Sequence, residues 1–211
     1  DLGLEILSQK EAEIQADVVE DGTTFEENAL IKASEIAKIA HEMPEYKDMI
    51  KAAYDKGHTI GMHTYSHDYA KVYASVDAYF QDLDQIGQMV QEEIGYVPCF
   101  IRFPGGSSNT VSKKYTAGIM STLVQEVQNR GYQYYDWNGS SGDGAVRTTE
   151  ELVAQATSFD SNNIILLCHD SHGKQTTVEA LPQIIEHYQS LGYTFKALDR
   201  DSFVAHHGVN N

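Results

Sequence analysis

The sequence predicts an α/β fold built on a parallel sheet, either open or closed into a barrel, and two observations carry this prediction. First, short apolar stretches alternate with longer amphipathic ones, in the order expected of repeated strand and helix units. Second, several apolar stretches end in ionisable residues, as strands do where their carboxyl ends form an active site. A chain of 211 residues is expected to form one domain, spanning residues 1–211, with a substantial core.

The first third of the chain is predicted to hold one strand and two helices. Residues 2–7 fit a strand, and residues 25–40 fit a helix whose alanines and isoleucines share one face. A second helix is predicted over residues 44–55, because proline is favoured in a first turn and glycine follows the last turn.

The remaining elements continue the alternation. Ile60 and Met62 mark a short strand, and residues 76–94 form a long helix whose apolar side chains make one stripe. The later predictions are strands at 100–103, 132–137, 164–168 and 194–198, helices at 119–130, 150–159 and 178–191, and a Gly/Ser-rich loop at 138–144.

The composition restricts the function classes. A net charge of −16 disfavours nucleic acid or an anionic membrane as a partner, whereas a neutral glycan is compatible with it. No apolar run is long enough to span a bilayer, and these residues contain no signal peptide, although a removed leader stays open. Cys99 and Cys168 lie in apolar runs and are interpreted as reduced core residues, with a disulfide as the alternative.

A pair of histidines, His63 and His67, is the first candidate for chemistry. Histidines four residues apart can reach one cation from a single turn or tight loop, and neutral imidazole is a common zinc ligand. A catalytic zinc site needs three protein ligands and a water. The alternative is that both histidines cap or pack, since the chain has nine histidines.

Four of the predicted strands are followed by ionisable residues. Because the carboxyl ends of parallel strands lie at one edge of the sheet, these residues are expected to gather there. Together they favour hydrolysis at a metal, with a nearby acid–base group and an arginine that orients it. In strand order, these residues are His63 and His67, Arg102, Asp136 and Asp143, and His169 and Asp170.

Four motifs in this order resemble those of the NodB-like polysaccharide deacetylases, which are carbohydrate esterases of family 4. They are His-Thr-Tyr-Ser-His at 63–67, Arg-Phe-Pro-Gly-Gly at 102–106, the Asp-Trp to Asp loop at 136–143, and Leu-Cys-His at 167–169. The resemblance covers about residues 44–211. It implies a distorted (β/α) barrel of the NodB deacetylase type, in an extracellular or cell-envelope protein.

The resemblance also implies an activity and the residues for it. A divalent metal, zinc or in some cases cobalt, would serve in removing N-acetyl groups from a glycan such as peptidoglycan or chitin. By likeness, His63 and His67 bind the metal, while His169 protonates the leaving amine. The other implied residues are Arg102, which holds the catalytic carboxylate, Asp143, which tunes His169, Leu167, which lines the acetyl pocket, and Pro104, Gly105 and Trp137 at the substrate.

The chain departs from this family at its front. The family opens with Thr-Phe-Asp-Asp-Gly, and the nearest segment in this chain is Val-Val-Glu-Asp-Gly at 18–22. By this match, Glu20 would be the catalytic base and Asp21 the third metal ligand. The extra methylene of glutamate displaces the carboxylate by about 1 Å, enough to cost about 100-fold in rate. A further departure is at Ser140, a position where members of the NodB-like family often carry aspartate.

Residues 1–40 resemble a different family, the Ham1-type nucleoside triphosphate pyrophosphatases, through Glu-Asp-Gly-Thr-Thr-Phe-Glu-Glu-Asn-Ala at 20–29. The phosphate-binding lysine and a second magnesium carboxylate of that family are absent. One interpretation is therefore a chimera, with an atypical opening βα segment before a deacetylase-like body at 44–211. A folded but catalytically disabled scaffold is the alternative to an active deacetylase, and a pyrophosphatase is the remote one. The oligomeric state is not predicted.

Overall fold

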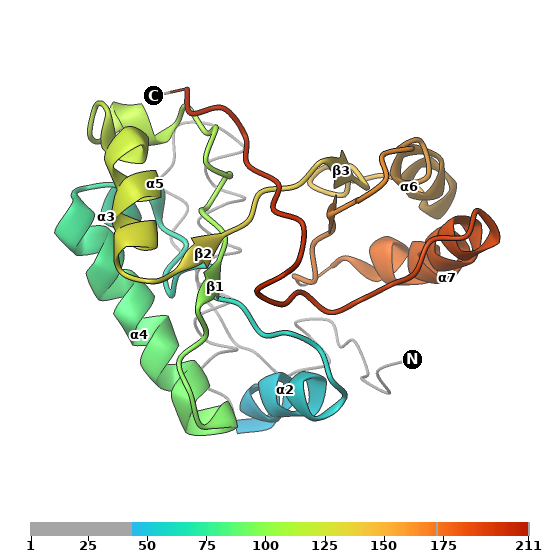
Figure 1. Cartoon of the computed structure of the whole chain (residues 1–211), viewed down its shortest axis with the longest axis horizontal. Helices are drawn as coiled ribbons and strands as arrows, with labels where there is room; N and C mark the ends of the chain where they lie inside the picture. The colour runs from blue at the N-terminus through green and yellow to red at the C-terminus, as the bar shows by residue number, and fades with distance from the viewer. Residues whose placement is uncertain (1–43, 172, 211) are drawn as a thin grey trace. The chain divides into compact units, whose positions relative to one another are not determined.

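The computed structural model describes residues 44–171 and 173–210 of the chain. These residues form two compact units (Figure 1): unit 1 comprises 44–136 and 206–210, and unit 2 comprises 137–171 and 173–205. The strand predicted at 2–7 and the helix predicted at 25–40 lie outside the described residues.

Unit 1 is organised around short parallel strands. β1 (Phe100–Ile101) pairs in parallel with β2 (Gln133–Tyr134), with Ile101 opposite Tyr134. On the other side of β1, Met62 forms a parallel bridge with Ile101. β1 is therefore the middle of three parallel segments, and the chain leaves all three in the same direction, as predicted for parallel strand–helix units.

Helices cover the strands of unit 1. They are α2 (Pro44–Asp55), α3 (Tyr69–Val72), α4 (Val76–Ile94) and α5 (Ile119–Asn129), with the 3₁₀ helix η1 (Ser112–Lys114). The Ser75 hydroxyl caps α4 by accepting from the backbone N–H of Ala78, and Gly95 ends the helix in the left-handed conformation. The buried stripe of α4 packs with the strands into one core, which includes Tyr79, Leu83, Ile86, Met62, Ile101 and Phe103.

Unit 2 repeats the arrangement on a smaller scale. β3 (Gly139–Ser140) pairs in parallel with β4 (Leu166–Leu167), and α6 (Thr149–Ala156) packs against α7 (Gln175–Ser190). Thr148 and Glu151 form a capping box at the start of α6. The core of this unit consists of Leu152, Ala156, Ala180, Ile184 and Tyr188.

The predicted limits of the helices agree with the structure better than the predicted limits of the strands do. The helices at 44–55 and 76–94 have the predicted ends, whereas each observed strand is only two residues long. The loop predicted at 138–144 contains β3, and α3 and η1 were not predicted. α7 begins three residues before the predicted helix at 178–191.

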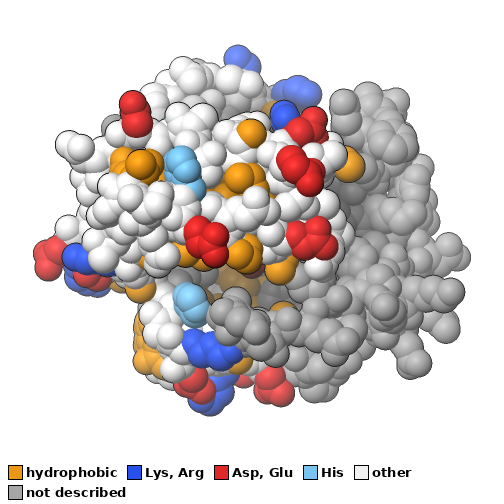
Figure 2. Space-filling view, turned by 90° about the vertical axis from the view of Figure 1, so that its right-hand side faces the viewer, with side chains coloured by type: hydrophobic (Ala, Val, Ile, Leu, Met, Phe, Trp, Pro, Cys, Tyr) orange, Lys and Arg blue, Asp and Glu red, His pale blue; other side chains and the backbone are white. Residues whose placement is uncertain are grey.

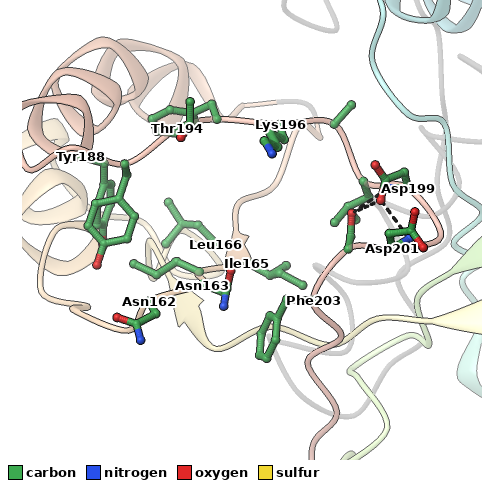
Figure 3. Close-up of a pocket in the computed structure, with 16 residues that line it drawn as sticks. Asn162, Asn163, Ile165, Leu166, Tyr188, Thr194, Lys196, Asp199, Asp201 and Phe203 are labelled. Atoms are coloured by element: carbon green, nitrogen blue, oxygen red, sulfur yellow. Dashed lines mark hydrogen bonds between the residues drawn. The ribbon is translucent and has the colours of Figure 1, made fainter.

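The strand predicted at 194–198 is wrong. These residues have no regular structure and line a cavity of about 410 Å³ in unit 2, together with Ile165 and Leu166 (Figure 3). Strand pairing needs backbones about 4.8 Å apart. A cavity, and not a hydrogen-bonded ladder, lies beside residues 194–198.

The surface agrees with the acidic composition. Figure 2 shows one face on which acidic side chains are scattered, while lysines and arginines lie toward its margin.

Across the described residues, no helix combines the length and apolar character needed to cross a bilayer. Neither Cys99 nor Cys168 forms a disulfide with another described residue, in agreement with the preferred interpretation, although each is only half-buried.

Candidate active site

The paired histidines lie in a loop that leaves the carboxyl end of a parallel segment in unit 1. His63 follows Met62, and its Nδ1 lies 2.8 Å from the carbonyl oxygen of Arg102, which follows the neighbouring strand β1. The rings of His63 and His67 have centroids 4.9 Å apart. Because parallel strands end at the same edge, the two motifs meet where the sequence predicted.

The backbone of this loop is strained. Thr64 and His67 have φ angles of 65° and 50°, and they are the two non-glycine residues with positive φ in the described part of the chain. Such conformations cost about 1–3 kcal/mol each and persist where surrounding contacts over-determine them. Here the Asp82 carboxylate in α4 accepts hydrogen bonds from the backbone N–H groups of Tyr65 and Ser66.

The turn after Arg102 depends on glycine. Gly105 has a φ of 74°, and a Cβ at this position would lie 2.7 Å from the hydroxyl oxygen of Tyr69. Pro104 is buried, and its carbonyl oxygen accepts a 2.7 Å hydrogen bond from the Tyr73 hydroxyl. Pro104 and Gly105 therefore form a rigid turn beside the histidine loop, since Tyr69 also contacts the ring of His67.

Asp136, one of the ionisable residues singled out in the sequence, is an anchor buried in unit 1. Its carboxylate accepts hydrogen bonds from the backbone N–H and hydroxyl of Ser107, at 2.8 and 2.5 Å, and from the backbone N–H of His207 at 2.8 Å. It thus ties residues near the C-terminal end to the turn after β1. His206 stacks on Tyr134 with ring centroids 3.8 Å apart.

In unit 2, Asp143 and His169 form a direct pair. His169 Nδ1 lies 2.8 Å from Asp143 Oδ1, and the His169 backbone N–H donates to Oδ2 at 2.7 Å. The parallel pairing of β3 with β4 places the two residues together, because each lies just beyond the carboxyl end of its strand. The side chain of Asp143 is 2% exposed and that of His169 is 41% exposed.

Further donors converge on Asp143. The Thr177 hydroxyl in α7 donates to Oδ2 at 3.0 Å, and the Lys174 ammonium donates to the backbone carbonyl of Asp143. Burial by itself raises the pKa of the Asp143 carboxyl, but hydrogen bonds from His169, Ser141 and Thr177 outweigh burial and leave the pKa below its usual range. Asp143 is therefore an ionised anchor for His169.

The other predicted residues of unit 2 lie around this pair. Leu167 is half-buried in β4, and its carbonyl oxygen accepts the backbone N–H of Ser141 at 3.0 Å. Ser140, where relatives of the resembled family often carry Asp, accepts from the backbone N–H of Gly142 at 3.1 Å. Trp137 is half-buried. Burial raises the pKa of the neighbouring Cys168 thiol, which keeps it in the unreactive protonated form.

The structure thus brings the predicted residues together in two groups. Unit 1 joins His63, His67 and Arg102, and unit 2 joins Asp143 and His169. Glu20 and Asp21 lie outside the described residues. Within 44–171 and 173–210, no three His, Cys, Asp or Glu side chains form a group that could hold a metal ion.

Sequence reasoning missed two side chains that organise these groups, Asp82 and Thr177. Asp82 lies on α4, directly before the buried Leu83, and Thr177 is the first buried residue of α7; neither belongs to a recognisable motif. Only a polar residue placed next to a buried helical stripe could have signalled them.

Comparisons with known proteins identify the family of this chain. The family model for polysaccharide deacetylases matches residues 32–124. The catalytic domain of peptidoglycan N-acetylglucosamine deacetylase from Eubacterium rectale is 35% identical, with a TM-score of 0.77, and the match covers 95% of this chain and all of that one. The chain belongs to the polysaccharide deacetylase family.

The chain is also similar to longer curated proteins. A peptidoglycan N-acetylglucosamine deacetylase of Bacillus cereus is 26% identical over 174 residues, which are 78% of this chain and 59% of that protein. A chitin deacetylase of Arthroderma benhamiae is 32% identical over 142 residues, which are 66% of this chain and 35% of that protein. The chain thus spans less than two thirds of the length of these curated relatives.

The predicted fold class is confirmed, because the solved relatives are NodB-type deacetylase domains with a distorted (β/α) barrel. The chimera interpretation gains no support from these relatives, which are deacetylases and not pyrophosphatases. Residues 1–40, which carried the likeness to pyrophosphatases, lie outside the described residues. The prediction of a single domain over 1–211 stays a prediction.

Proposed function

We propose that this chain is the catalytic domain of a metal-dependent hydrolase that removes N-acetyl groups from a peptidoglycan-like or chitin-like glycan. The observation that carries the proposal is the Asp143–His169 pair, a buried ionised carboxylate that orients an accessible imidazole. The solved relatives of this chain include a peptidoglycan deacetylase domain. An extracellular or cell-envelope location belongs to the same proposal, because such glycans are found there.

His169 has the arrangement of a proton donor. Because a carboxylate can only accept, Nδ1 of His169 carries the proton that bonds to Asp143, and Nε2 is the atom left to exchange a proton with substrate. In the proposed reaction, His169 protonates the nitrogen of the leaving amine as the C–N bond breaks. Leu167, two residues earlier, is proposed to line the pocket for the acetyl methyl group.

His63 and His67 are proposed as metal ligands, and the geometry of His63 fits this role. The Arg102 carbonyl oxygen can only accept, so Nδ1 of His63 carries the proton and Nε2 keeps the lone pair that a metal requires. We propose Asp21 as the third ligand and zinc as the metal, with cobalt as the alternative. When bound, such a metal polarises the amide carbonyl and lowers the pKa of the attacking water.

The remaining roles follow the same proposal. Arg102 holds the catalytic carboxylate, which is Glu20 in this chain, and that carboxylate accepts the proton of the attacking water. The rigid turn of Pro104 and Gly105, with Trp137, contacts the sugar. Trp137 offers the apolar ring face on which a pyranose packs.

Acetate release tests the function. With zinc present, the wild-type protein should release acetate from N-acetylated chitooligosaccharides or from peptidoglycan fragments. His169→Ala should lower the rate by about 10²- to 10⁴-fold, the usual contribution of a general acid, while zinc binding stays intact. His187→Ala, which removes a histidine of α7 outside the proposed site, serves as the matched control. Equal rates in His169→Ala and His187→Ala would contradict the proposed role.

One observation favours the second candidate, a folded deacetylase scaffold that has lost activity. Glu20 stands where the resembled family has aspartate, and the longer side chain displaces the carboxylate. If this displacement limits the rate, Glu20→Asp should raise acetate release by up to about 100-fold without changing zinc affinity. The assay compares kcat for both proteins on one oligosaccharide, with Glu20→Gln as the inactive reference. A rate for Glu20→Asp no higher than for Glu20→Gln would reject Glu20 as the base.

A further inference from the structure

One acidic side chain fastens the histidine loop to the rest of unit 1. Asp82 Oδ1 accepts from the backbone N–H of Tyr65 at 2.5 Å, and both carboxylate oxygens lie 3.2 Å from the backbone nitrogen of Ser66. Asp82 Oδ2 also accepts a 2.5 Å hydrogen bond from the Ser66 hydroxyl. One carboxylate therefore receives three donors from the two residues at the centre of the loop.

The carboxylate itself is held on a rigid support. Asp82 lies near the middle of α4, where Tyr79, Leu83 and Ile86, at positions three before, one after and four after it, are buried in the core. A helix anchored by such a stripe cannot shift without disturbing the core packing. The position of Asp82 is thus set by the fold and not by the loop that it binds.

The loop needs such a support because its backbone conformation is unfavourable by itself. The residues with positive φ, Thr64 and His67, lie directly on either side of Tyr65 and Ser66. Hydrogen bonds to a charged acceptor are stronger than those to water or to a neutral group. The bonds to Asp82 therefore favour this conformation over the alternatives that a five-residue polar loop would otherwise adopt.

We propose that Asp82 is a positioning residue for the metal site, which selects the loop conformation that lets His63 and His67 share one cation. The loop is then fixed at two points, by the Arg102 carbonyl at His63 and by Asp82 at its centre, and the centroids of the two histidine rings lie 4.9 Å apart. This inference rests on the proposed metal site. It assigns to α4 a task that the four sequence motifs do not include.

The first measurement is made on the metal-free protein. Asp82→Asn keeps the shape of the side chain but replaces one acceptor oxygen by a donor, which faces the Ser66 N–H and hydroxyl. We expect amide hydrogen exchange at Tyr65 and Ser66 to become at least about tenfold faster. Asp84→Asn is the matched control, because it removes the same charge from an exposed position two residues further along α4.

The second measurement is the affinity for zinc, by calorimetric titration of the same metal-free proteins. Asp82→Asn should bind zinc about 10- to 100-fold more weakly than wild type, the range found when outer-shell partners of a metal site are replaced. Asp84→Asn should match wild type. Ser66→Ala, which removes only the hydroxyl donor, should weaken zinc binding by a smaller factor, and it supplies the answer if Asp82→Asn does not fold.

The outcomes separate this inference from the proposed function. Weaker zinc binding together with faster exchange in Asp82→Asn supports the positioning role. If wild type binds zinc through His63, but Asp82→Asn and Ser66→Ala bind it as tightly as Asp84→Asn does, the positioning role is overturned and the metal site stands. If wild type binds no zinc, the metal site fails, and the positioning role is overturned with it whatever the exchange rates show.

Discussion

At the scale of residues, Asp143 and His169 differ in the exposure of their side chains, and this difference suits the proposed proton transfer. The Asp143 side chain is 2% exposed and accepts hydrogen bonds from His169, Ser141 and Thr177, so its orientation is fixed. The His169 side chain is 41% exposed, so its ring can meet a substrate. In general acid catalysis the accessible imidazole donates the proton, while the buried carboxylate holds the ring in place.

The same pair makes a prediction for stability against pH. Because the pKa of Asp143 is lower in the folded protein than its ordinary value of 3.8, the ionised carboxylate stabilises the fold above that value, and this contribution is lost as pH falls through the lowered pKa. Asp143→Asn should therefore be less stable than wild type at neutral pH, with a difference that shrinks in acid. Urea unfolding midpoints at a series of pH values would measure it.

The control for that experiment is Asp160→Asn, which removes an exposed carboxylate from the same unit. It should leave the pH dependence of the midpoint unchanged. If Asp143→Asn kept the same loss of stability in acid as wild type, Asp143 would not be ionised by its hydrogen bonds as inferred.

At the scale of elements, α7 contributes to the site through one hydroxyl. Thr177 is buried in the first turn of α7, and its hydroxyl lies 3.0 Å from Asp143 Oδ2. It thereby couples the position of the helix to the orientation of the carboxylate and, through it, of the His169 ring. Helix packing, and not only the motif loops, shapes the proposed active site.

Substitution of Thr177 tests this coupling. Thr177→Val keeps the shape of the side chain but removes the donor, so kcat for acetate release should fall by about threefold to tenfold, the value of one net hydrogen bond, with KM nearly unchanged. Thr177→Ser restores the hydroxyl and should recover most of kcat. A loss of similar size in both variants would indicate a packing effect in place of a hydrogen-bonded one.

Helices and strands also differed in how well they could be predicted. The ends of α2 and α4 follow from local signals, such as Pro44 at the start of one helix and the Ser75 cap and Gly95 of the other. Strand limits depend on partners far along the chain, so the predicted strand at 100–103 has only Phe100 and Ile101 in the ladder. For the same reason, the apolar pattern at 194–198 did not produce a strand.

At the scale of the whole molecule, the same arrangement of parallel strands brings candidate residues together once in each unit. A parallel pair in unit 1 joins His63 to Arg102, and a parallel pair in unit 2 joins Asp143 to His169. In each case, residues more than twenty positions apart meet because parallel strands end at the same edge.

Metal binding at the proposed site should stabilise the whole chain. A ligand that binds only the folded state, at a free concentration about 100 times its Kd, stabilises it by about 2.7 kcal/mol. Zinc should therefore raise the Tm of the wild-type protein in a concentration-dependent way, and His63→Ala should abolish most of the increase. Thermal unfolding followed by circular dichroism measures both, and His187→Ala should respond as wild type does. An equal rise of Tm in His63→Ala would exclude His63 as a ligand.

The sequence by itself determined the α/β class and the family, and it predicted the histidines, arginine and aspartate of the proposed site, because motif order and helix caps are local properties of the chain. Only the tertiary structure decided how those residues are held. The strained backbone at Thr64 and His67, the Asp82 carboxylate beneath that loop and the Thr177 hydroxyl on Asp143 all depend on contacts between distant segments. Such contacts follow from packing in three dimensions, which no spacing along the chain expresses.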